Sequence, residues 1–247
     1  MKTPTILLYH QISVLTDALD PYGISVTPDN FAAQMQYLAD NDYTVMKLSD
    51  AIKQMRKDDS ALPDKCVVIT FDDGYRDNMT NALPILEKHS FPATIFTVAD
   101  HVGKFAVWDG DIGAQMPLLT WDEMRDMLPH GIEFGSHTCT HVHLPDMDDD
   151  VVEREVRTSK RIIEDHLGVA VETLAYPYEE FNQTSLMMTE RAGYLAACGT
   201  WRMPETFYNL WRVEIGKADT LGRFQNKISR LYKPYTRLKK NIKDWLR

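Results

Sequence analysis

Cysteine is scarce in this 247-residue chain, which has three, at positions 66, 139 and 198. An odd number of cysteines, two of them within apolar strand-like runs, argues against a disulfide-linked secreted domain and favours a reduced protein. The chain also lacks a stretch long enough to span a bilayer, and the apolar run within its first ten residues is too short for a signal peptide. We therefore expect a cytoplasmic location, and the initial Met argues against a removed leader.

Positive charge is sparse in most of the chain and concentrated at its end. Residues 223–247 hold nine Lys or Arg and one acid, for a net charge of +8, whereas residues 1–222 hold 18 basic and 35 acidic residues, for a net charge of −17. This division predicts one large acidic domain, residues 1–222, followed by a basic tail, residues 223–247. The acidic domain disfavours nucleic acid as a partner.

Short apolar runs alternate with amphipathic helical patterns, which is typical of a parallel sheet wrapped by helices. The strand candidates are Thr5–Tyr9, Cys66–Phe71, Ala93–Val98, Ile132–Ser136, Glu172–Tyr176, Leu195–Cys198 and Trp211–Ile215. The helix candidates are Pro28–Leu38, Thr120–Leu128, Asp148–Leu167 and Thr184–Ala192. Seven strands favour a barrel over an open sheet, although periodicity alone leaves its closure open.

Acidic residues and histidines follow two separate strand candidates. Asp72 and Asp73 end one apolar run, and His137 and His141 come after another. In a parallel barrel the carboxyl ends of the strands share one face, where active sites are built. One carboxylate with two imidazoles makes a three-ligand site with room for water, which suits a catalytic divalent metal: zinc first, with cobalt or nickel as alternatives. The other carboxylate is then spare and can act as a base.

These residues also carry a family resemblance. Thr-Phe-Asp-Asp-Gly at 70–74 and Ser-His-Thr-Cys-Thr-His at 136–141 resemble the first two motifs of the polysaccharide deacetylases, the NodB-like family 4 carbohydrate esterases. Ala-Tyr-Pro-Tyr at 175–178 resembles the third motif, and Leu-Leu-Tyr-His-Gln-Ile at 7–12 resembles the branch that acts on poly-N-acetylglucosamine exopolysaccharide. The similarity extends from about residue 5 to about residue 215.

The resemblance implies a distorted, incomplete (β/α)7-type barrel that removes N-acetyl groups from an amino-sugar glycan. At the positions that match the motifs, Asp73, His137 and His141 would hold the metal, and Asp72 would be the catalytic base. The metal would polarise the acetyl carbonyl and lower the pKa of its water. The backbone N–H of Tyr178 would stabilise the oxyanion.

The chain departs from the family pattern at three places. Ala175 stands where many members have an arginine that orients the base, and Arg212 in the last strand candidate is our replacement for it. The fifth-motif histidine that supplies the leaving-group proton is not visible, and His10 is our candidate for that acid. A structural role is the alternative for both replacements. The third motif also continues as Glu179-Glu180 where relatives often have glycine.

Substrate contacts and rival functions complete the hypothesis. Trp108, Trp201 and Tyr178 are candidates to stack on sugar rings. The substrate would be an N-acetylated glycan or, for a cytoplasmic protein, a lipid- or nucleotide-linked precursor. No G-x-S-x-G elbow occurs, so we expect no serine nucleophile. A metal-dependent phosphohydrolase using Asp72 and a carbohydrate-binding relative without turnover remain as alternatives.

The basic tail repeats apolar residues at steps of three or four, with Lys and Arg between them. Pro234 interrupts the pattern, so two short helices fit better than one. One interpretation is a basic helix packed on the acidic barrel. The other is a tail that lies on anionic lipid and brings the protein to the inner face of the membrane.

Overall fold

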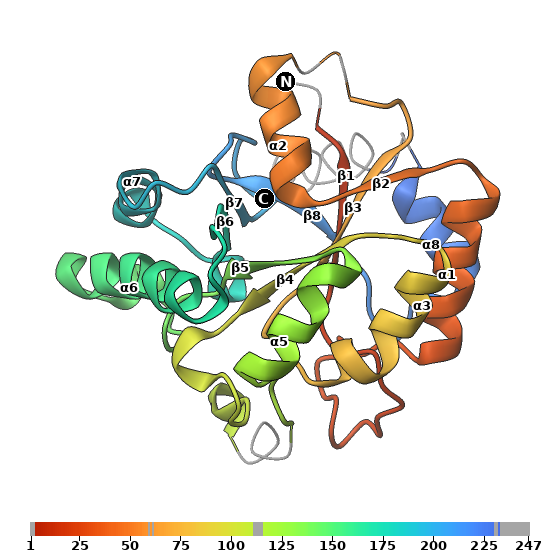
Figure 1. The fold of residues 1–247 in the computed structure, drawn as a ribbon, viewed down its shortest axis with the longest axis horizontal. Helices are drawn as coiled ribbons and strands as arrows, with labels where there is room; N and C mark the ends of the chain where they lie inside the picture. Colours follow the sequence, from red (N-terminus) through yellow and green to blue (C-terminus); the bar gives the residue numbers. More distant parts are fainter. Residues whose placement is uncertain (1–2, 59, 61, 111–115, 230–231, 233–247) are drawn as a thin grey trace, which may run out of the picture.

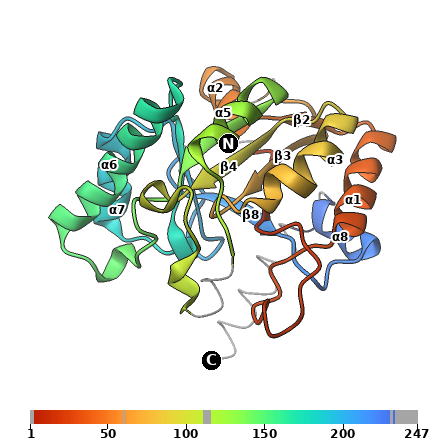
Figure 2. The same ribbon diagram turned by 60° about the horizontal axis from the view of Figure 1, so that its bottom comes forward.

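The computed structural model describes residues 3–58, 60, 62–110, 116–229 and 232. Its strands are β1 (Thr5–Tyr9), β2 (Thr44–Met46), β3 (Cys66–Phe71), β4 (Ala93–Thr97), β5 (Ile132–Ser136), β6 (Thr173–Ala175), β7 (Ala196–Gly199) and β8 (Leu210–Glu214). Its α-helices are α1 (Pro28–Asp40), α2 (Leu48–Lys57), α3 (Leu83–Lys88), α5 (Trp121–Met127), α6 (Asp149–Leu167), α7 (Gln183–Arg191) and α8 (Leu221–Ile228). Helices α1, α3 and α8 lie on one side of the strands and α6 and α7 on the opposite side (Figure 1), an arrangement that the turned view of Figure 2 also shows.

Seven of these strands close into a barrel. Their hydrogen bonds follow the order β1-β8-β7-β6-β5-β4-β3, and β1 pairs with β3 from Thr5–Val67 to Tyr9–Phe71. Every pairing is parallel, so the carboxyl ends of the strands meet at one end of the barrel. The predicted (β/α)7-type barrel is confirmed.

The barrel is distorted at β3. Strand β1 takes one edge of β3, while β2 and β4 share the other edge, pairing with residues 66–68 and 70–71 respectively. The sequence analysis did not predict β2, because a segment of three residues without an apolar run carries almost no periodic signal. The seven predicted strands are all present, and their ends differ from the prediction by at most one residue.

Alternation along the strands separates two cores. Outward side chains such as Leu7 and Tyr9 pack against the surrounding helices, whereas Ile6, Val68 and Phe96 form an interior cluster with residues of α2. Gly135 on β5 is required beside this interior, because a Cβ there would lie 2.5 Å from the Phe96 ring. Toward the carboxyl ends of the strands, the inward-facing positions carry polar side chains, and these lie at the mouth of the barrel.

Helix α8 crosses the predicted boundary between the acidic domain and the basic tail. It begins at Leu221, and its Phe224 and Ile228 are at most 3% exposed within the main hydrophobic core. The first turns of the predicted tail are therefore part of the folded domain, since the apolar side chains of α8 pack there. The rest of the tail pattern, from residue 233 onward, lies outside the described residues.

Candidate active site

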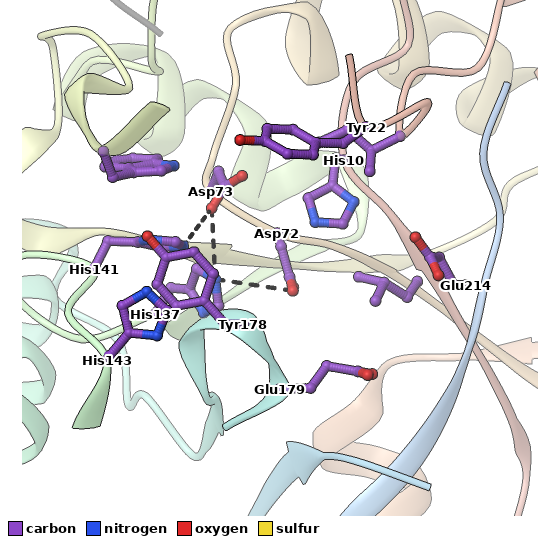
Figure 3. Close-up of a pocket in the computed structure, with 13 residues that line it drawn as sticks. His10, Tyr22, Asp72, Asp73, His137, His141, His143, Tyr178, Glu179 and Glu214 are labelled. Carbon is purple, nitrogen blue, oxygen red and sulfur yellow. Dashed lines mark ion pairs between the residues drawn. The ribbon is translucent and has the colours of Figure 1, made fainter. Parts of the chain in front are cut away.

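Asp73, His137 and His141 converge at the carboxyl end of the barrel. The Nε2 atoms of His137 and His141 lie 3.5 Å and 3.2 Å from Oδ1 of Asp73, and all three residues are buried. Figure 3 shows both imidazoles turned toward this carboxylate. Burial opposes ionisation of Asp73, but the close approach of His141 and the nearby His137 and His10 outweigh burial and hold its pKa below the usual range.

This cluster fits a divalent metal. One ligand atom from each of the three residues lies within 4.8 Å of the others, and Oδ1 of Asp73 has no hydrogen-bond partner among the described residues. Ligands about 2.0–2.1 Å from a tetrahedral zinc ion stand about 3.3–3.4 Å apart, close to the spacings here. A carboxylate with two imidazoles suits zinc, and also cobalt or nickel.

The barrel fixes which nitrogen of His137 faces the cluster. Its Nδ1 lies 2.7 Å from the carbonyl oxygen of Ala175 on β6. Because a carbonyl only accepts hydrogen bonds, Nδ1–H donates and Nε2 is left as the ligand atom. Burial lowers the pKa of His137 to about 4, which keeps the imidazole neutral at physiological pH.

Glu155 of α6 holds the loop between the two histidines. Its carboxylate accepts hydrogen bonds of 2.9 Å from the backbone N–H groups of Cys139 and Thr140 and from the Thr140 hydroxyl, and it is 2% exposed. The sequence analysis missed this residue. Its only signal was a charged residue on the face of α6 that also carries Val152 and Val156.

Cys139 is not part of the cluster of Asp73, His137 and His141, although it lies between the two histidines in the sequence. Its side chain is buried, and burial raises the pKa of the thiol to about 12. Cys139 is therefore a buried free thiol that acts as a small core side chain.

Asp72 points into the barrel and meets Arg212 of β8. The guanidinium donates two hydrogen bonds, from Nη1 to Oδ1 at 2.6 Å and from Nη2 to Oδ2 at 2.7 Å, and both residues are at most 3% exposed. Burial opposes ionisation of Asp72 most strongly, but the charge of Arg212, its hydrogen bonds to the carboxylate and the nearby His137 and His10 together outweigh burial and lower the pKa of the carboxyl. Oδ2 of Asp72 lies 3.9 Å from Nε2 of His137. The Asp72–Arg212 ion pair therefore borders the cluster of Asp73, His137 and His141.

A cleft of about 560 Å³ opens over both groups. His10, which follows β1, lines this cleft, and its buried Nδ1 has no hydrogen-bond partner among the described residues. Trp108 also lines it and stacks on His141, with ring centroids 4.4 Å apart and planes at 20°. The structure does not bring Trp201 to the cleft: it lies in the loop after β7, outside the described lining.

Tyr178 lies at the mouth of the cleft in the short 3₁₀ turn η7 (Pro177–Glu179). Its φ and ψ of 58° and 13° are left-handed. Its ring makes an edge contact with the His141 ring, and the two centroids are 4.7 Å apart. The neighbouring Glu179 also has a positive φ, of 56°. This backbone places the two side chains on different walls of the cleft, Tyr178 beside His141 and Glu179 across from it (Figure 3).

Glu179 and Glu214 are acidic cleft residues that the sequence analysis did not assign to the site. Burial raises the pKa of Glu179 to about 7, against the pull of Arg212 and with the help of the negative Asp72 and Glu214. Tyr22 and His143 are further lining residues that the sequence analysis did not assign to the site. Their only signal in the sequence was proximity to a motif, which does not say where a side chain points.

Comparison with known proteins assigns the barrel to a family. The family model for polysaccharide deacetylases matches residues 59–197, which is more than half of the chain. The chain therefore belongs to the polysaccharide deacetylase family.

Curated relatives support the same assignment. YxkH of Bacillus subtilis, a protein assigned to the polysaccharide deacetylases, is 31% identical over 189 residues, which cover 76% of this chain and 61% of YxkH. A poly-β-1,6-N-acetyl-D-glucosamine N-deacetylase of Staphylococcus epidermidis is 27% identical over 191 residues, covering 74% of this chain and 63% of that protein. The chain thus spans about three fifths of the length of these relatives.

Solved structures share the fold. The Streptococcus pyogenes deacetylase PplD, solved in complex with acetate, has a TM-score of 0.79 and 25% identity, with 93% of this chain and 99% of that chain covered. BC0361, a polysaccharide deacetylase from Bacillus cereus, has a TM-score of 0.74 and 28% identity, with coverage of 93% and 69%. Both comparisons extend over nearly the whole of this chain.

Proposed function

We propose that this protein hydrolyses N-acetyl groups on an amino-sugar glycan in a metal-dependent reaction, with Asp72 as the base. The observation that carries the proposal is the Asp72–Arg212 ion pair at the edge of the Asp73, His137 and His141 cluster, inside one cleft. The curated relatives named as poly-β-1,6-N-acetyl-D-glucosamine N-deacetylases support this class of substrate. A lipid- or nucleotide-linked precursor would present the same N-acetyl group.

Asp73, His137 and His141 would hold the metal, zinc first and cobalt or nickel as alternatives. A divalent cation in such a site supplies Lewis acidity toward a carbonyl oxygen and makes water a stronger acid. The protein contributes two imidazole nitrogens, that of His137 kept neutral by burial, and one buried carboxylate oxygen close to both. Its hydrogen bond to Ala175 keeps the ring of His137 in this orientation.

Asp72 would accept the proton of the attacking water. Its lowered pKa keeps the carboxylate ionised, and Arg212 fixes both oxygens while leaving each with a further lone pair. Arg212 would therefore act as the positioning residue in place of the arginine that Ala175 replaces. His10 would return a proton to the departing amine, and the backbone N–H of Tyr178 would donate to the oxyanion.

Acetate release tests the proposal. The protein, stripped with chelator and reloaded with zinc, cobalt or nickel, is offered N-acetylglucosamine oligosaccharides, sugar nucleotides and glycolipids. We expect metal-dependent release of acetate from at least one class. Asp72→Asn should retain the metal but lose about 10²–10⁴-fold in kcat, because an amide cannot accept the proton. His137→Ala should lose stoichiometric metal, and His10→Gln should lower kcat with the metal retained.

The rival functions predict other results. Phosphate release from phosphoesters without acetate release would show a phosphohydrolase. Glycan binding without any product would show a relative that has lost turnover. Near-normal kcat in Asp72→Asn would remove Asp72 from the role of base, and full metal occupancy in His137→Ala would remove His137 from the metal site.

A further inference from the structure

His143 lies two residues after His141 but does not face the metal cluster. Its ring stacks on that of Tyr178, with centroids 3.8 Å apart and planes parallel within 1°. Its Nδ1 lies 2.9 Å from Oε2 of Glu180, and because a carboxylate only accepts, Nδ1–H donates this hydrogen bond. Figure 3 shows the Tyr178 and His143 rings lying over one another beside His141.

The segment that His143 contacts has a backbone that needs support. Tyr178 and Glu179 are consecutive non-glycine residues with φ of 58° and 56°. Residues other than glycine rarely adopt this left-handed backbone conformation. They keep it where surrounding contacts enforce it. Backbone hydrogen bonds from Glu179 to Tyr176 and from Glu180 to Pro177 close the turn, but they do not attach it to the loop that carries His141.

Side-chain contacts make that attachment. The Tyr178 ring contacts both histidines: it makes an edge contact with His141 at a centroid distance of 4.7 Å and stacks in parallel on His143. Glu180 then ties His143 back to the turn. The loop after β5 and the turn after β6 are thus joined at the mouth of the cleft.

We propose that His143 and Glu180 are positioning residues that clasp Tyr178 against the metal-binding loop. The clasp consists of His143, Tyr178 and Glu180. It fixes the left-handed backbone at Tyr178. It thereby fixes the direction of the Tyr178 backbone N–H, which is the proposed donor to the oxyanion. The kinetic consequence rests on the proposed deacetylase function, whereas the existence of the clasp does not.

An exposed His–Glu pair by itself contributes little to stability, and the chain offers a matched control. Nδ1 of His130 lies 2.5 Å from Oε1 of Glu87, and the side chains are 47% and 43% exposed, against 48% and 53% for His143 and Glu180. His130 lies in the turn before β5 and therefore at the opposite end of the barrel from the cleft. Neither His130 nor Glu87 is among the described residues that line the cleft.

The first test is structural and uses the metal-free protein. With ¹³C-labelled tyrosine, NMR should show the Tyr178 ring protons shifted upfield by the stacked imidazole, with Tyr178→Phe to assign the signal. His143→Ala should move this signal toward the random-coil position, and His130→Ala should leave it in place. An unchanged Tyr178 signal in His143→Ala would overturn the clasp.

The second test is kinetic and uses the metal-loaded protein. His143→Ala should lower kcat about tenfold with KM within about twofold, less than the roughly 100-fold cost of losing one oxyanion donor outright, because the N–H is misplaced rather than removed. His143→Phe keeps the aromatic face and should recover most of kcat. Glu180→Ala should lower kcat less than His143→Ala, since the stack persists, and His130→Ala should match wild type.

The two tests separate the two proposals. If the wild-type protein releases no acetate from any substrate, the deacetylase proposal fails, while the Tyr178 signal still decides whether the clasp exists. If acetate is released and His143→Ala retains wild-type kcat, the positioning role is overturned and the deacetylase proposal stands. An equal loss in His143→Ala and His143→Phe would also contradict it, because the aromatic face would then contribute nothing.

Discussion

Left-handed backbone is concentrated in the loops of the cleft. Seven non-glycine residues have a positive φ among the described residues, and five of them are Asp73, Thr138, His141, Tyr178 and Glu179. Each costs roughly 1–2 kcal/mol relative to ordinary backbone. Strain of this kind persists where the surroundings over-determine it, and it is characteristic of functional sites. The site is therefore held in place by its contacts.

Glu179 should make stability depend on pH. Its pKa is raised from about 4.5 to about 7, mainly by burial. Between these values the folded protein holds a proton that the unfolded chain has lost, so this residue makes the free energy of unfolding fall as pH rises from about 4.5 to 7. We expect Glu179→Gln to remove about 1–3 kcal/mol of that decrease. Urea unfolding of the metal-free protein at a series of pH values measures it.

Glutamine has nearly the same shape as glutamate but does not titrate, so Glu179→Gln removes only the titration of this carboxyl. Glu190→Gln provides the control, because Glu190 is an exposed residue of α7 and is not part of the clasp. If Glu179→Gln follows the wild-type stability curve between pH 4.5 and 7, the buried carboxyl does not titrate as described.

Individual site residues differ in how far the sequence could predict them. Asp72, Asp73, His137 and His141 were found because motif spacing and strand ends locate them together. Arg212 could be named as a candidate from its strand, but its two hydrogen bonds to Asp72 join residues 140 positions apart. Trp201 was predicted to contact the sugar but lies outside the described cleft lining, because the sequence alone does not say where a loop side chain points.

At the scale of elements, α6 supports the loop between His137 and His141 through one buried carboxylate, that of Glu155. Glu155→Ala would leave two backbone N–H groups without an acceptor in a buried site. We expect a loss of about 2–5 kcal/mol in the free energy of unfolding and weaker metal binding, since His141 lies in the loosened loop. Thermal unfolding and competition with a chelator measure the two effects.

Glu153 on the same helix offers the control for Glu155. Its side chain is 50% exposed and pairs with Arg157 one turn away. Glu153→Ala should change stability by less than about 0.5 kcal/mol. If Glu155→Ala is as mild as Glu153→Ala, the loop does not depend on α6.

Elements were predictable where their pattern was long or marked by a cap, with the exception of the ten-residue α2, which was not among the predicted helices. The 19 residues of α6 carry acids at the start, a buried face and a terminal Gly168, and the predicted bounds agree within one residue. Strand β2 is three residues long, and α3 is six residues with a proline in its first turn, so neither has enough length for a period to show. Their positions follow from pairing with β3 and packing against α1, which are contacts between distant segments.

At the scale of the whole molecule, charge is divided between an acidic domain and a basic end. Within the described residues no helix is both long and apolar enough to cross a membrane. Lys227 of α8 donates a hydrogen bond of 2.7 Å to Asp219, so one tail charge is already engaged by the domain. Burial of Phe224 and Ile228 means that a truncation after Gly222 would remove part of the core. A chain that ends at Ser229 keeps α8 and is therefore the suitable truncation to compare with the full chain.

We propose that the residues beyond Ser229 bind anionic lipid and hold a cytoplasmic deacetylase near a lipid-linked glycan. They carry seven Lys or Arg and one Asp, with Trp245 and aliphatic residues between them. Each basic residue near an anionic surface contributes about 1 kcal/mol. We expect the full chain to sediment with anionic vesicles at low salt and to be released at high salt, where charges are screened. The chain ending at Ser229 should stay in solution, and neutral vesicles should bind neither. If the full chain ignores anionic vesicles at low salt, or if the truncated chain binds them equally, the basic residues do not anchor the protein, and packing on the acidic domain is the better account.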